Sequence, residues 1–158
     1  MSLLSSSQPS FDMNLFTIGF TQKRAEVFFG TLASHGVRSL VDIRLNPGGQ
    51  LAGFAKREDL PFFLDRLAGG CQYVHLPALA PTKAILKEYR EDGDWARYVS
   101  RFEQLMDERD VPASLDRVLF ESMSCCLLCS EPAPPKCHRR LVAERIARYW
   151  SNVEIIHL

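Results

Sequence analysis

Short apolar runs alternate with segments of helical periodicity along nearly the whole chain, and this alternation constrains the fold more than any other feature. The runs have the length and composition of buried strands. They cover residues 15–19, 40–44, 72–76, 125–130 and 153–158. Between them, apolar residues recur three and four positions apart, as they do on one face of a helix. The helices predicted from this spacing cover residues 22–35, 58–68, 82–90, 95–109 and 137–150.

Strands that alternate with helices are typical of an α/β protein with a parallel sheet. The run at 40–44 is short and rich in apolar residues, which indicates a strand covered on both faces. We therefore predict a three-layer, Rossmann-like α/β fold. It would have an open, mostly parallel sheet of about five strands with helices on both faces. Residues 116–121 fit either the end of a helix or a strand.

The chain has 158 residues, a length that fits one domain. Its Ser-rich beginning, residues 1–13, predicts a flexible tail, and residues 14–158 are expected to form a single α/β domain. Thr21 is placed to cap the first helix, and the Gly-rich segment 48–57 is predicted to be a surface loop.

Positive and negative charges balance, with 19 Lys and Arg residues against 19 Asp and Glu residues. Overall charge therefore does not favour nucleic acid as a partner. A local basic patch of Lys56, Arg57 and the arginines of 139–148 is an alternative. No apolar run approaches the roughly 18 residues that a membrane helix needs, so we expect no membrane contact. Five cysteines and no recognisable signal peptide predict a cytoplasmic protein whose thiols are free or bound to a metal.

The densest group of reactive side chains lies where the fourth predicted strand leads into the last predicted helix. Its members are Cys129, Glu131, Cys137, His138 and Arg139. A thiol near a helix N-terminus and beside a guanidinium is favoured as the thiolate, which is the nucleophilic form. Cys129 and Cys137 are therefore candidate catalytic residues, with Glu131 and His75 as candidate proton carriers.

In an open parallel sheet, ligands bind outside the carboxyl ends of the strands. Polar residues at these strand ends should therefore meet at one edge, together with the start of the last helix. The expected ligand-binding residues are Gly19, Thr21, Asp42, Arg44, His138 and Arg139. Two arginines, a glycine that permits close approach and a helix N-terminus suit a small anionic or nucleotide-like molecule. The sequence identifies no cofactor.

Not every cysteine is expected to serve the site. Cys125 and Cys126 are predicted to be core residues, because free cysteine is among the most buried residue types. Cys129 fits the core and the site equally well. The spacing of Cys126 and Cys129 matches a redox or zinc pair, but residues three apart on a strand point to opposite faces.

Two alternatives concern the same polar edge. Asp42 and Arg44 either pair with each other as a structural clasp, or Arg44 binds an anion that Asp42 orients. A metal site is the second alternative, although adjacent ligands at 137 and 138 are awkward and no metal is assigned. Its ligands would come from Cys129, Cys137, His138 and His75.

Several of these blocks together resemble the uncharacterised family catalogued as domain of unknown function 488. They are Thr17-Ile18-Gly19, Val41-Asp42-Ile43-Arg44 with Pro47, Tyr73-Val74-His75-Leu76-Pro77, Leu127-Leu128-Cys129-Ser130-Glu131 and Cys137-His138-Arg139. The resemblance runs from Leu15 to Trp150. Many members carry Leu-Gly-Gly after the third strand, where this chain has Ala78-Leu79-Ala80-Pro81. The resemblance implies the fold and the place of the site, and it implies no reaction.

The leading hypothesis is a cytoplasmic enzyme, a thiol-dependent transferase or hydrolase that acts on a small anionic or nucleotide-like molecule. Arg44, Arg139 and the helix start at Cys137 would hold the anion. The alternatives are a ligand-sensing or nucleic-acid-associated module without catalysis, and a structural zinc site.

Overall fold

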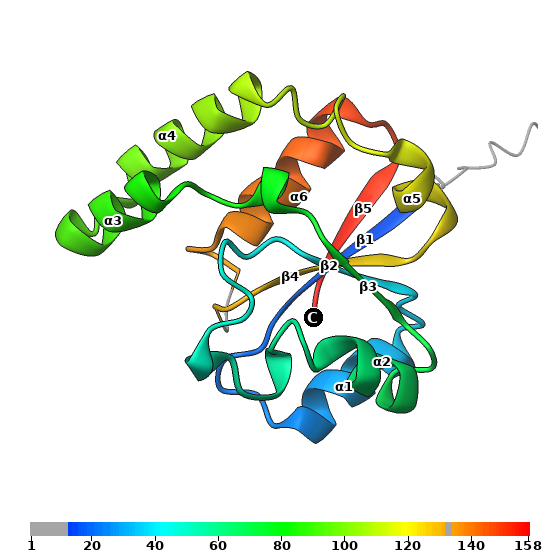
Figure 1. The fold of residues 1–158 in the computed structure, drawn as a ribbon. Coiled ribbons are helices and arrows are strands. Elements are labelled where there is room, and N and C mark those ends of the chain that lie inside the picture. Colours follow the sequence, from blue (N-terminus) through cyan, green and yellow to red (C-terminus); the bar gives the residue numbers. More distant parts are fainter. Residues whose placement is uncertain (1–12, 132–133) are drawn as a thin grey trace, which may run out of the picture.

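The computed structural model describes residues 13–131 and 134–158 (Figure 1). It contains a five-stranded parallel sheet with the strand order β3-β2-β4-β1-β5. The strands are β1 (Met13–Gly19), β2 (Ser39–Asp42), β3 (Gln72–His75), β4 (Cys125–Cys129) and β5 (Val153–His157). The predicted tail lies outside the described residues except for Met13, which is the first residue of β1 and pairs with Val153.

Helices connect the strands. They are α1 (Ala25–Ser34), α2 (Leu60–Leu67), α3 (Lys83–Asp92), α4 (Trp95–Glu108), α5 (Arg117–Ser122) and α6 (His138–Tyr149). Two short 3-10 helices, η1 (Gln50–Ala55) and η2 (Pro77–Leu79), follow β2 and β3. The predicted α/β fold is thus confirmed. Among the described residues, no helix is both long and apolar enough to cross a membrane.

The sheet separates two apolar cores, one on each face (Figure 1). Helices α1 and α2 cover one face, where Phe28 and Leu64 belong to the same core as Leu128 of β4. Helices α4, α5 and α6 cover the other, where Phe102 and Ile146 belong to the core that holds Leu127. Because successive strand residues point to opposite faces, β4 contributes to both cores.

The chain leaves the neighbouring strands β2 and β4 towards opposite edges of the sheet. The chain passes from β2 outward to β3 by α2, and from β4 to the opposite edge at β5 by α6. The carboxyl ends of β2 and β4 therefore flank the topological switch point, where open α/β sheets have their binding crevice. This relationship places the candidate site.

Three segments that the sequence left ambiguous or predicted otherwise are settled by the structure. Asp116 accepts hydrogen bonds from the backbone N–H groups of Val118 and Leu119, so the ambiguous segment 116–121 begins helix α5. Thr21 was wrongly predicted to cap α1, which begins at Ala25 with Arg24 as N-cap and no side-chain cap bond. The segment predicted to be a loop, 48–57, contains η1.

Candidate active site

The register of the sheet brings the predicted strand-end residues to one edge. Gly19 of β1 lies beside Cys129 of β4, and Asp42 of β2 lies beside both Leu128 and His75. Their convergence follows from parallel pairing, because all carboxyl ends then face the same way. The expectation of a shared edge is confirmed for Gly19, Asp42, His75 and Cys129.

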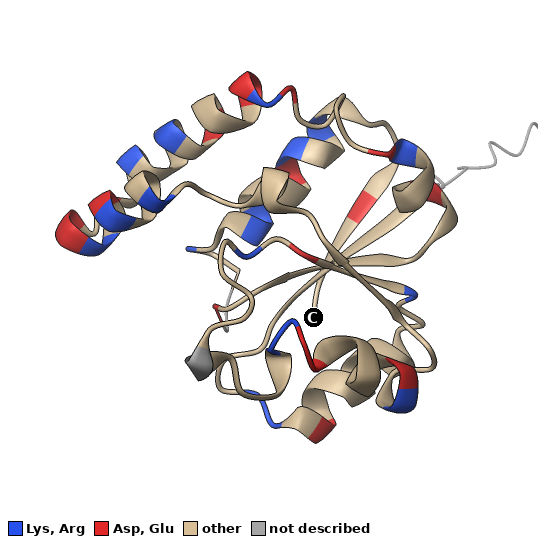
Figure 2. Ribbon diagram, viewed as in Figure 1, with Lys and Arg blue, Asp and Glu red and all other residues tan. Residues whose placement is uncertain are grey.

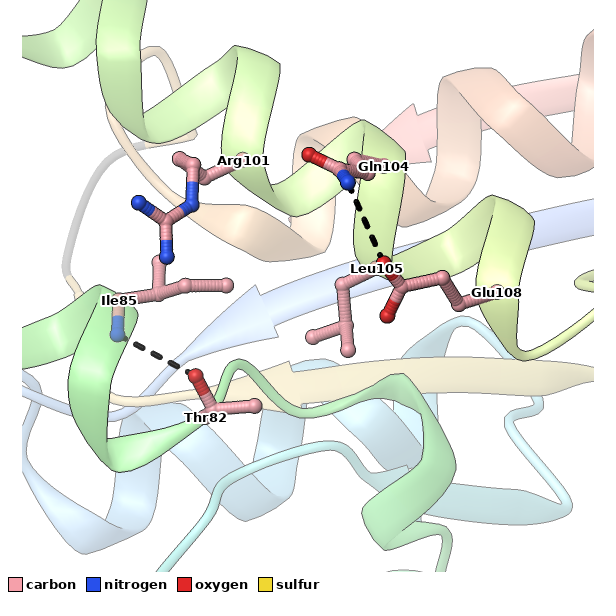
Figure 3. Close-up of a pocket in the computed structure, with 6 residues that line it drawn as sticks. All are labelled: Thr82, Ile85, Arg101, Gln104, Leu105 and Glu108. Carbon is pink, nitrogen blue, oxygen red and sulfur yellow. Dashed lines mark hydrogen bonds between the residues drawn. The ribbon is translucent and has the colours of Figure 1, made fainter.

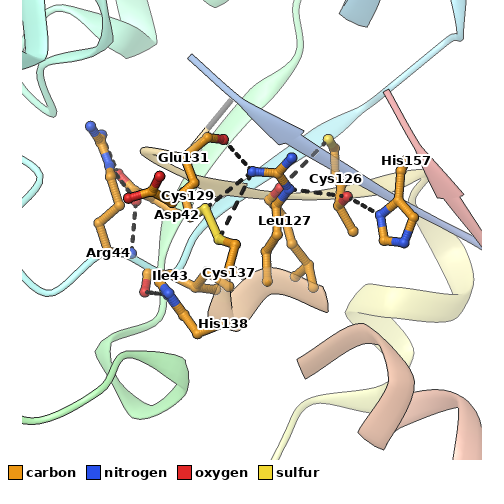
Figure 4. Close-up of a disulfide and its surroundings, with 12 residues drawn as sticks. Asp42, Ile43, Arg44, Cys126, Leu127, Cys129, Glu131, Cys137, His138 and His157 are labelled. Atoms are coloured by element: carbon orange, nitrogen blue, oxygen red, sulfur yellow. Dashed lines mark hydrogen bonds and ion pairs between the residues drawn. A yellow bond between two sulfur atoms is a disulfide. The ribbon is translucent and has the colours of Figure 1, made fainter. Parts of the chain in front are cut away.

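Cys129 and Cys137 are joined by a disulfide at this edge (Figure 4). Cys129 ends β4, and Cys137 is the N-cap residue of α6. Their side chains are 1% and 2% exposed, and their Cα atoms are 7.7 Å apart. The bond joins the end of the central strand to the start of the helix, and both sulfur atoms lie where the helix dipole favours negative charge.

Arg139 is buried against these two sulfur atoms. Its side chain is 0% exposed, and its Nη1 atom lies 3.3 Å from Sγ of Cys129 and 3.9 Å from Sγ of Cys137. Nη1 also donates to the backbone carbonyl of Glu131, and Nε donates to Oγ1 of Thr17 at 3.3 Å. Burial lowers the pKa of Arg139. Within the described residues, Nη2 has no partner and no carboxylate oxygen is hydrogen-bonded to the guanidinium.

A buried guanidinium is stable only when a nearby group compensates its charge. Nη1 of Arg139 contacts both sulfur atoms of the disulfide. When the disulfide is reduced, these sulfur atoms can carry a negative charge as thiolates. Arg139 and the start of α6 together favour the thiolate form of a reduced cysteine. The arrangement therefore suits a reactive thiol.

Gly19 permits this close packing. A Cβ atom at position 19 would overlap the backbone carbonyl of Glu131 and would lie 2.7 Å from Nη1 of Arg139. Gly19 is thus needed for the close approach of Glu131 and Arg139, and its predicted role in ligand binding stays a prediction. Thr21, predicted beside it, is exposed, and its backbone N–H donates to the carbonyl of Ser130 at 3.1 Å.

His138 is held in one tautomer. Its Nε2 lies 2.8 Å from the carbonyl oxygen of Ile43, which only accepts, so Nε2 carries the proton and Nδ1 keeps its lone pair (Figure 4). Burial lowers the pKa of His138 to about 4, so the ring is neutral near pH 7. One donor atom each from Cys129, Cys137 and His138 lie within 4.8 Å of one another. These three residues could hold a metal ion if the cysteines were reduced.

Asp42 and Arg44 form the structural clasp that was one of the two predicted alternatives. Nε and Nη2 of Arg44 donate to the two carboxylate oxygens of Asp42 at 2.9 and 2.7 Å. Tyr73 donates to the same carboxylate at 2.6 Å, and Arg44 also donates to the carbonyl of Ala55 at 2.7 Å. Asp42 is 0% exposed. It orients Arg44, and its carboxylate is not open to a ligand.

A cavity of about 250 Å³ opens at the switch point between β2 and β4. Its lining comes from the ends of β2 and β4, from α3 and from α6: Arg44, Leu45, Asn46, Pro81, Leu86, Arg90, Cys129, Ser130, Glu131 and His138. Cys129 is the only cysteine among these lining residues. The sequence predictions that meet in this cavity are Arg44, Cys129, Glu131 and His138.

Arg90 is a lining residue that the sequence analysis missed. It is exposed in α3, and its guanidinium has no ion pair or hydrogen bond to any described residue. In sequence it is one of many charged residues on a helix face, so no local pattern distinguishes it. It reaches the site because Leu86 and Arg90 of α3 border the same cavity as Cys129 and Glu131.

His75 faces a neighbouring hollow. Its Nε2 donates to the carbonyl of Arg44 at 2.9 Å, and it lines a space of about 510 Å³ together with Arg57 and Glu58. Leu45 and Asn46 border both spaces. The structure therefore separates His75 from the cavity that Cys129 lines.

A second cavity, of about 330 Å³, lies between α3 and α4 (Figure 3). Its polar groups already have partners: Thr82 caps α3, Gln104 donates to Glu108 at 3.3 Å and Arg101 pairs with Glu88 at 3.2 Å. Neither a thiol nor an imidazole lines it. It lacks the chemistry of the first cavity.

The remaining cysteines are buried core residues, as predicted for Cys125 and Cys126. Burial raises the pKa of Cys71 to about 11 and of Cys125 to about 12, and it raises the pKa of Cys126 well above its ordinary value. Cys126 lies in the core opposite to that of Cys129, which confirms that the pair does not form a redox or zinc motif. These thiols are protonated near pH 7.

The arginines of α6 do not form a patch of free positive charge. Arg139 and Arg145 are buried, Arg145 is paired with Glu103 and Asp107, and Arg148 is paired with Glu103. Figure 2 shows positive and negative residues interspersed along α3 and α4. The α6 part of the predicted basic patch is therefore largely neutralised, whereas Lys56 and Arg57 have no ion pair among the described residues.

Comparison with known proteins gives one match. A family model described as Domain of unknown function DUF488 matches residues 24–146. That range contains every residue that lines the cavity at the switch point. No curated protein and no solved structure matches the chain.

Proposed function

The chain belongs to the DUF488 family, whose function is unknown, and from its site we propose that it binds a small anionic molecule in the switch-point cavity and reacts with it through Cys129. The activity would be that of a thiol-dependent transferase or hydrolase. The observation that carries the proposal is the contact of buried Arg139 with Sγ of Cys129 at 3.3 Å. It supplies a reason for Cys129 to be a thiolate when reduced.

Positive charge around the cavity supports an anionic ligand. Arg90 is unpaired at the rim, and the Nη1 atom of Arg44 has no hydrogen-bond partner among the described residues. Arg44 and Arg90 outnumber Glu131, the one carboxylate among the lining residues, so a carboxylate or phosphate would meet more positive than negative charge beside Cys129.

In the proposed reaction Glu131 rather than His138 transfers the proton. With a pKa of about 4, His138 is a weak base, and its Nδ1 keeps a lone pair. Glu131 is exposed at the cavity and is able to exchange protons with water. In the proposed reaction the Sγ lone pair of Cys129 forms a bond to the electrophilic atom of the ligand. The leaving group departs with the electrons of the broken bond and takes a proton delivered through Glu131.

Alkylation with two small reagents tests the proposal. Iodoacetate is anionic and iodoacetamide is neutral, and both are small enough for a cavity of about 250 Å³. In the reduced protein, the ratio of the iodoacetate rate to the iodoacetamide rate at Cys129 should exceed that of free glutathione at least about threefold, because positive charge concentrates the anion. High salt should abolish the excess.

Matched arginine variants separate a local effect from overall charge. Arg90→Gln should lower the iodoacetate preference, whereas Arg66→Gln, an exposed arginine of α2 on the other face, should leave it unchanged. Inorganic phosphate should protect Cys129 from alkylation in the wild-type protein. An iodoacetate preference no greater than that of glutathione, or equal effects of the two variants, would contradict anion binding.

A zinc site is the second candidate, favoured by the donor atoms of Cys129, Cys137 and His138 within 4.8 Å. The bond from Nε2 of His138 to the Ile43 carbonyl leaves Nδ1 as the ligand atom, as in many metal sites. Metal analysis of the protein purified under reducing conditions tests it. One zinc per chain, lost in Cys137→Ser, would favour this candidate, and a metal-free protein with a reactive Cys129 would exclude it.

A further inference from the structure

We propose that Cys129 and Cys137 form a reversible oxidation site, at which a hydroperoxide converts the two thiols to a disulfide. The inference concerns the regulation of the proposed thiol site and so rests on the proposed function. A bond between Cys129 and Cys137 removes the nucleophile from the cavity. Oxidation would therefore switch the site off, and reduction by a dithiol would restore it.

The two cysteines differ in their access to the cavity. Both pack within the core on the α6 side of the sheet, but Cys129 also lines the cavity and Cys137 is absent from its lining. An oxidant that enters the cavity thus meets Cys129 first. Cys137 lies within bonding contact behind it, so it is placed to react with an oxidised Cys129. Cys129 is the peroxide-reactive thiol, and Cys137 is the resolving thiol.

Chemical selectivity comes from direct contact with Arg139 and from burial of the other thiols, since burial outweighs the charge of Arg139 at Cys126. Its Nη1 atom contacts both sulfur atoms, at 3.3 and 3.9 Å, and no other cysteine accepts a hydrogen bond from it. Cys71, Cys125 and Cys126 are buried and are held in the thiol form. Because a thiolate reacts with a peroxide and a thiol does not, oxidation should be confined to two of the five cysteines.

The reaction balances with a hydroperoxide as the oxidant. The Cys129 thiolate attacks the outer peroxide oxygen, the O–O bond breaks, and the alkoxide or hydroxide that leaves takes up a proton, giving Cys129 sulfenic acid. The thiol of Cys137 then attacks Sγ of Cys129, and the S–O bond breaks with release of water. Two electrons pass from the cysteine pair to the peroxide. A small dithiol returns them by thiol–disulfide exchange.

Peptide mapping of the full chain tests the proposal without any ligand. The reduced protein is treated with hydrogen peroxide in the presence of a chelator, remaining thiols are alkylated, and the chain is digested with trypsin. Cleavage after Arg117, Lys136 and Arg139 places Cys129 in peptide 118–136 and Cys137 in peptide 137–139. We expect these peptides to become disulfide-linked through Cys129, with loss of two thiols per chain. Dithiothreitol should reverse the change.

Single variants test the order of the steps. In Cys137→Ser, Cys129 should accumulate as sulfenic acid that dimedone traps, with no linked peptides. In Cys129→Ser, Cys137 should be oxidised at least about tenfold more slowly than in the wild type, because it does not line the cavity. Cys71→Ala, which changes a buried cysteine of the other core, is the matched control and should oxidise as the wild type does.

Oxidation of Cys71, Cys125 or Cys126 at the rate of Cys129, or a mixture of pairings, would overturn the proposal. The wild-type map decides this even if a variant does not fold. The anion-preference experiment is separate, because it is made on the reduced protein. If the peptides link as expected and Cys129 shows no preference for iodoacetate, the result supports the oxidation site and contradicts anion binding. The reverse result leaves anion binding and removes the oxidation site.

Discussion

Nη1 of Arg139 lies 3.3 Å from Sγ of Cys129, inside the protein and at the carboxyl end of the central strand. The guanidinium has no hydrogen bond to a carboxylate among the described residues, and the charge of Glu131 acts on it only at longer range. When the disulfide is reduced, a thiolate at Cys129 would place a negative charge in direct contact with Nη1. This contact links stability to reactivity. A thiolate at Cys129 compensates the buried charge, and the buried charge in turn stabilises the thiolate.

The first prediction concerns this contact. In the reduced protein, Arg139→Gln should slow the alkylation of Cys129 by iodoacetamide at least about tenfold near pH 7, because the thiolate loses its partner. The midpoint of the alkylation rate against pH should move upward. Arg148→Gln, an exposed arginine of the same helix, is the control and should keep the wild-type midpoint. An unchanged profile in a folded Arg139→Gln protein would show that the guanidinium does not activate Cys129.

The second prediction concerns Gly19. Gly19→Ala places a methyl group against the Glu131 carbonyl and Arg139, so the site must shift. We expect a loss of about 1–3 kcal/mol in the free energy of unfolding, together with slower alkylation of Cys129. Gly30→Ala is the matched control. Gly30 lies in α1 with no atom near the new methyl group, and its replacement should stabilise the protein by about 0.5–1 kcal/mol. Equal effects of the two variants in urea unfolding would contradict the close-approach argument.

The third prediction concerns the clasp of Asp42 and Arg44. Asp42→Asn leaves a buried guanidinium without its counter-charge, and the expected loss is about 3–5 kcal/mol in the free energy of unfolding. The exposed pair of Arg117 and Glu121 is the comparison. Glu121→Gln should cost no more than about 1 kcal/mol. Urea denaturation of both variants measures the difference, and similar losses would mean that burial does not amplify the Asp42 contact.

The fourth prediction concerns pH and His138. Its pKa is about 4 in the folded protein and 6.5 ordinarily, so the unfolded chain binds more protons between these values. The stability contributed by neutral His138 is present above pH 6.5 and is lost as the pH falls towards 4. The loss is at most about 3 kcal/mol.

The matching variant is His138→Gln, which keeps a donor for the Ile43 carbonyl and does not titrate. Its unfolding free energy should vary less with pH than that of the wild type over this range. The pKa of His157 is also lowered by burial, so His157→Gln should remove part of the slope with the same sign. If the slope of the wild type persists in His138→Gln, the assignment to His138 is wrong.

Much of the fold followed from local sequence pattern. Apolar runs separated by helical periods predict a parallel sheet, and in a parallel sheet the carboxyl ends of all strands share one edge. The meeting of Gly19, Asp42 and Cys129 could therefore be predicted without coordinates. The capping error at Thr21 is a local one, because cap residues and helix boundaries depend on the path of the preceding turn.

The composition of the cavity was less predictable. The sequence places Asp42 and Arg44 on one face of the strand. Their ion pair is held in place by Tyr73 from the adjacent strand and by the Ala55 carbonyl. Arg90 reaches the cavity from α3, and His75 faces the hollow beside it. Each outcome depends on contacts between residues distant in sequence, which periodicity does not encode.

The sequence by itself determined the order of the strands and of the helices other than α5, the burial of Cys125 and Cys126, and the grouping of Cys129, Cys137 and Arg139 near one junction. Those features depend on spacing of at most a few helical turns. Only the tertiary structure decided that Arg139 is buried against the sulfur atoms and that Cys129 faces a cavity while Cys137 does not. The physical reason is that the burial of a side chain and its access to a cavity depend on how the helices pack on the sheet. This packing brings together side chains that are far apart in sequence, and no local pattern marks them.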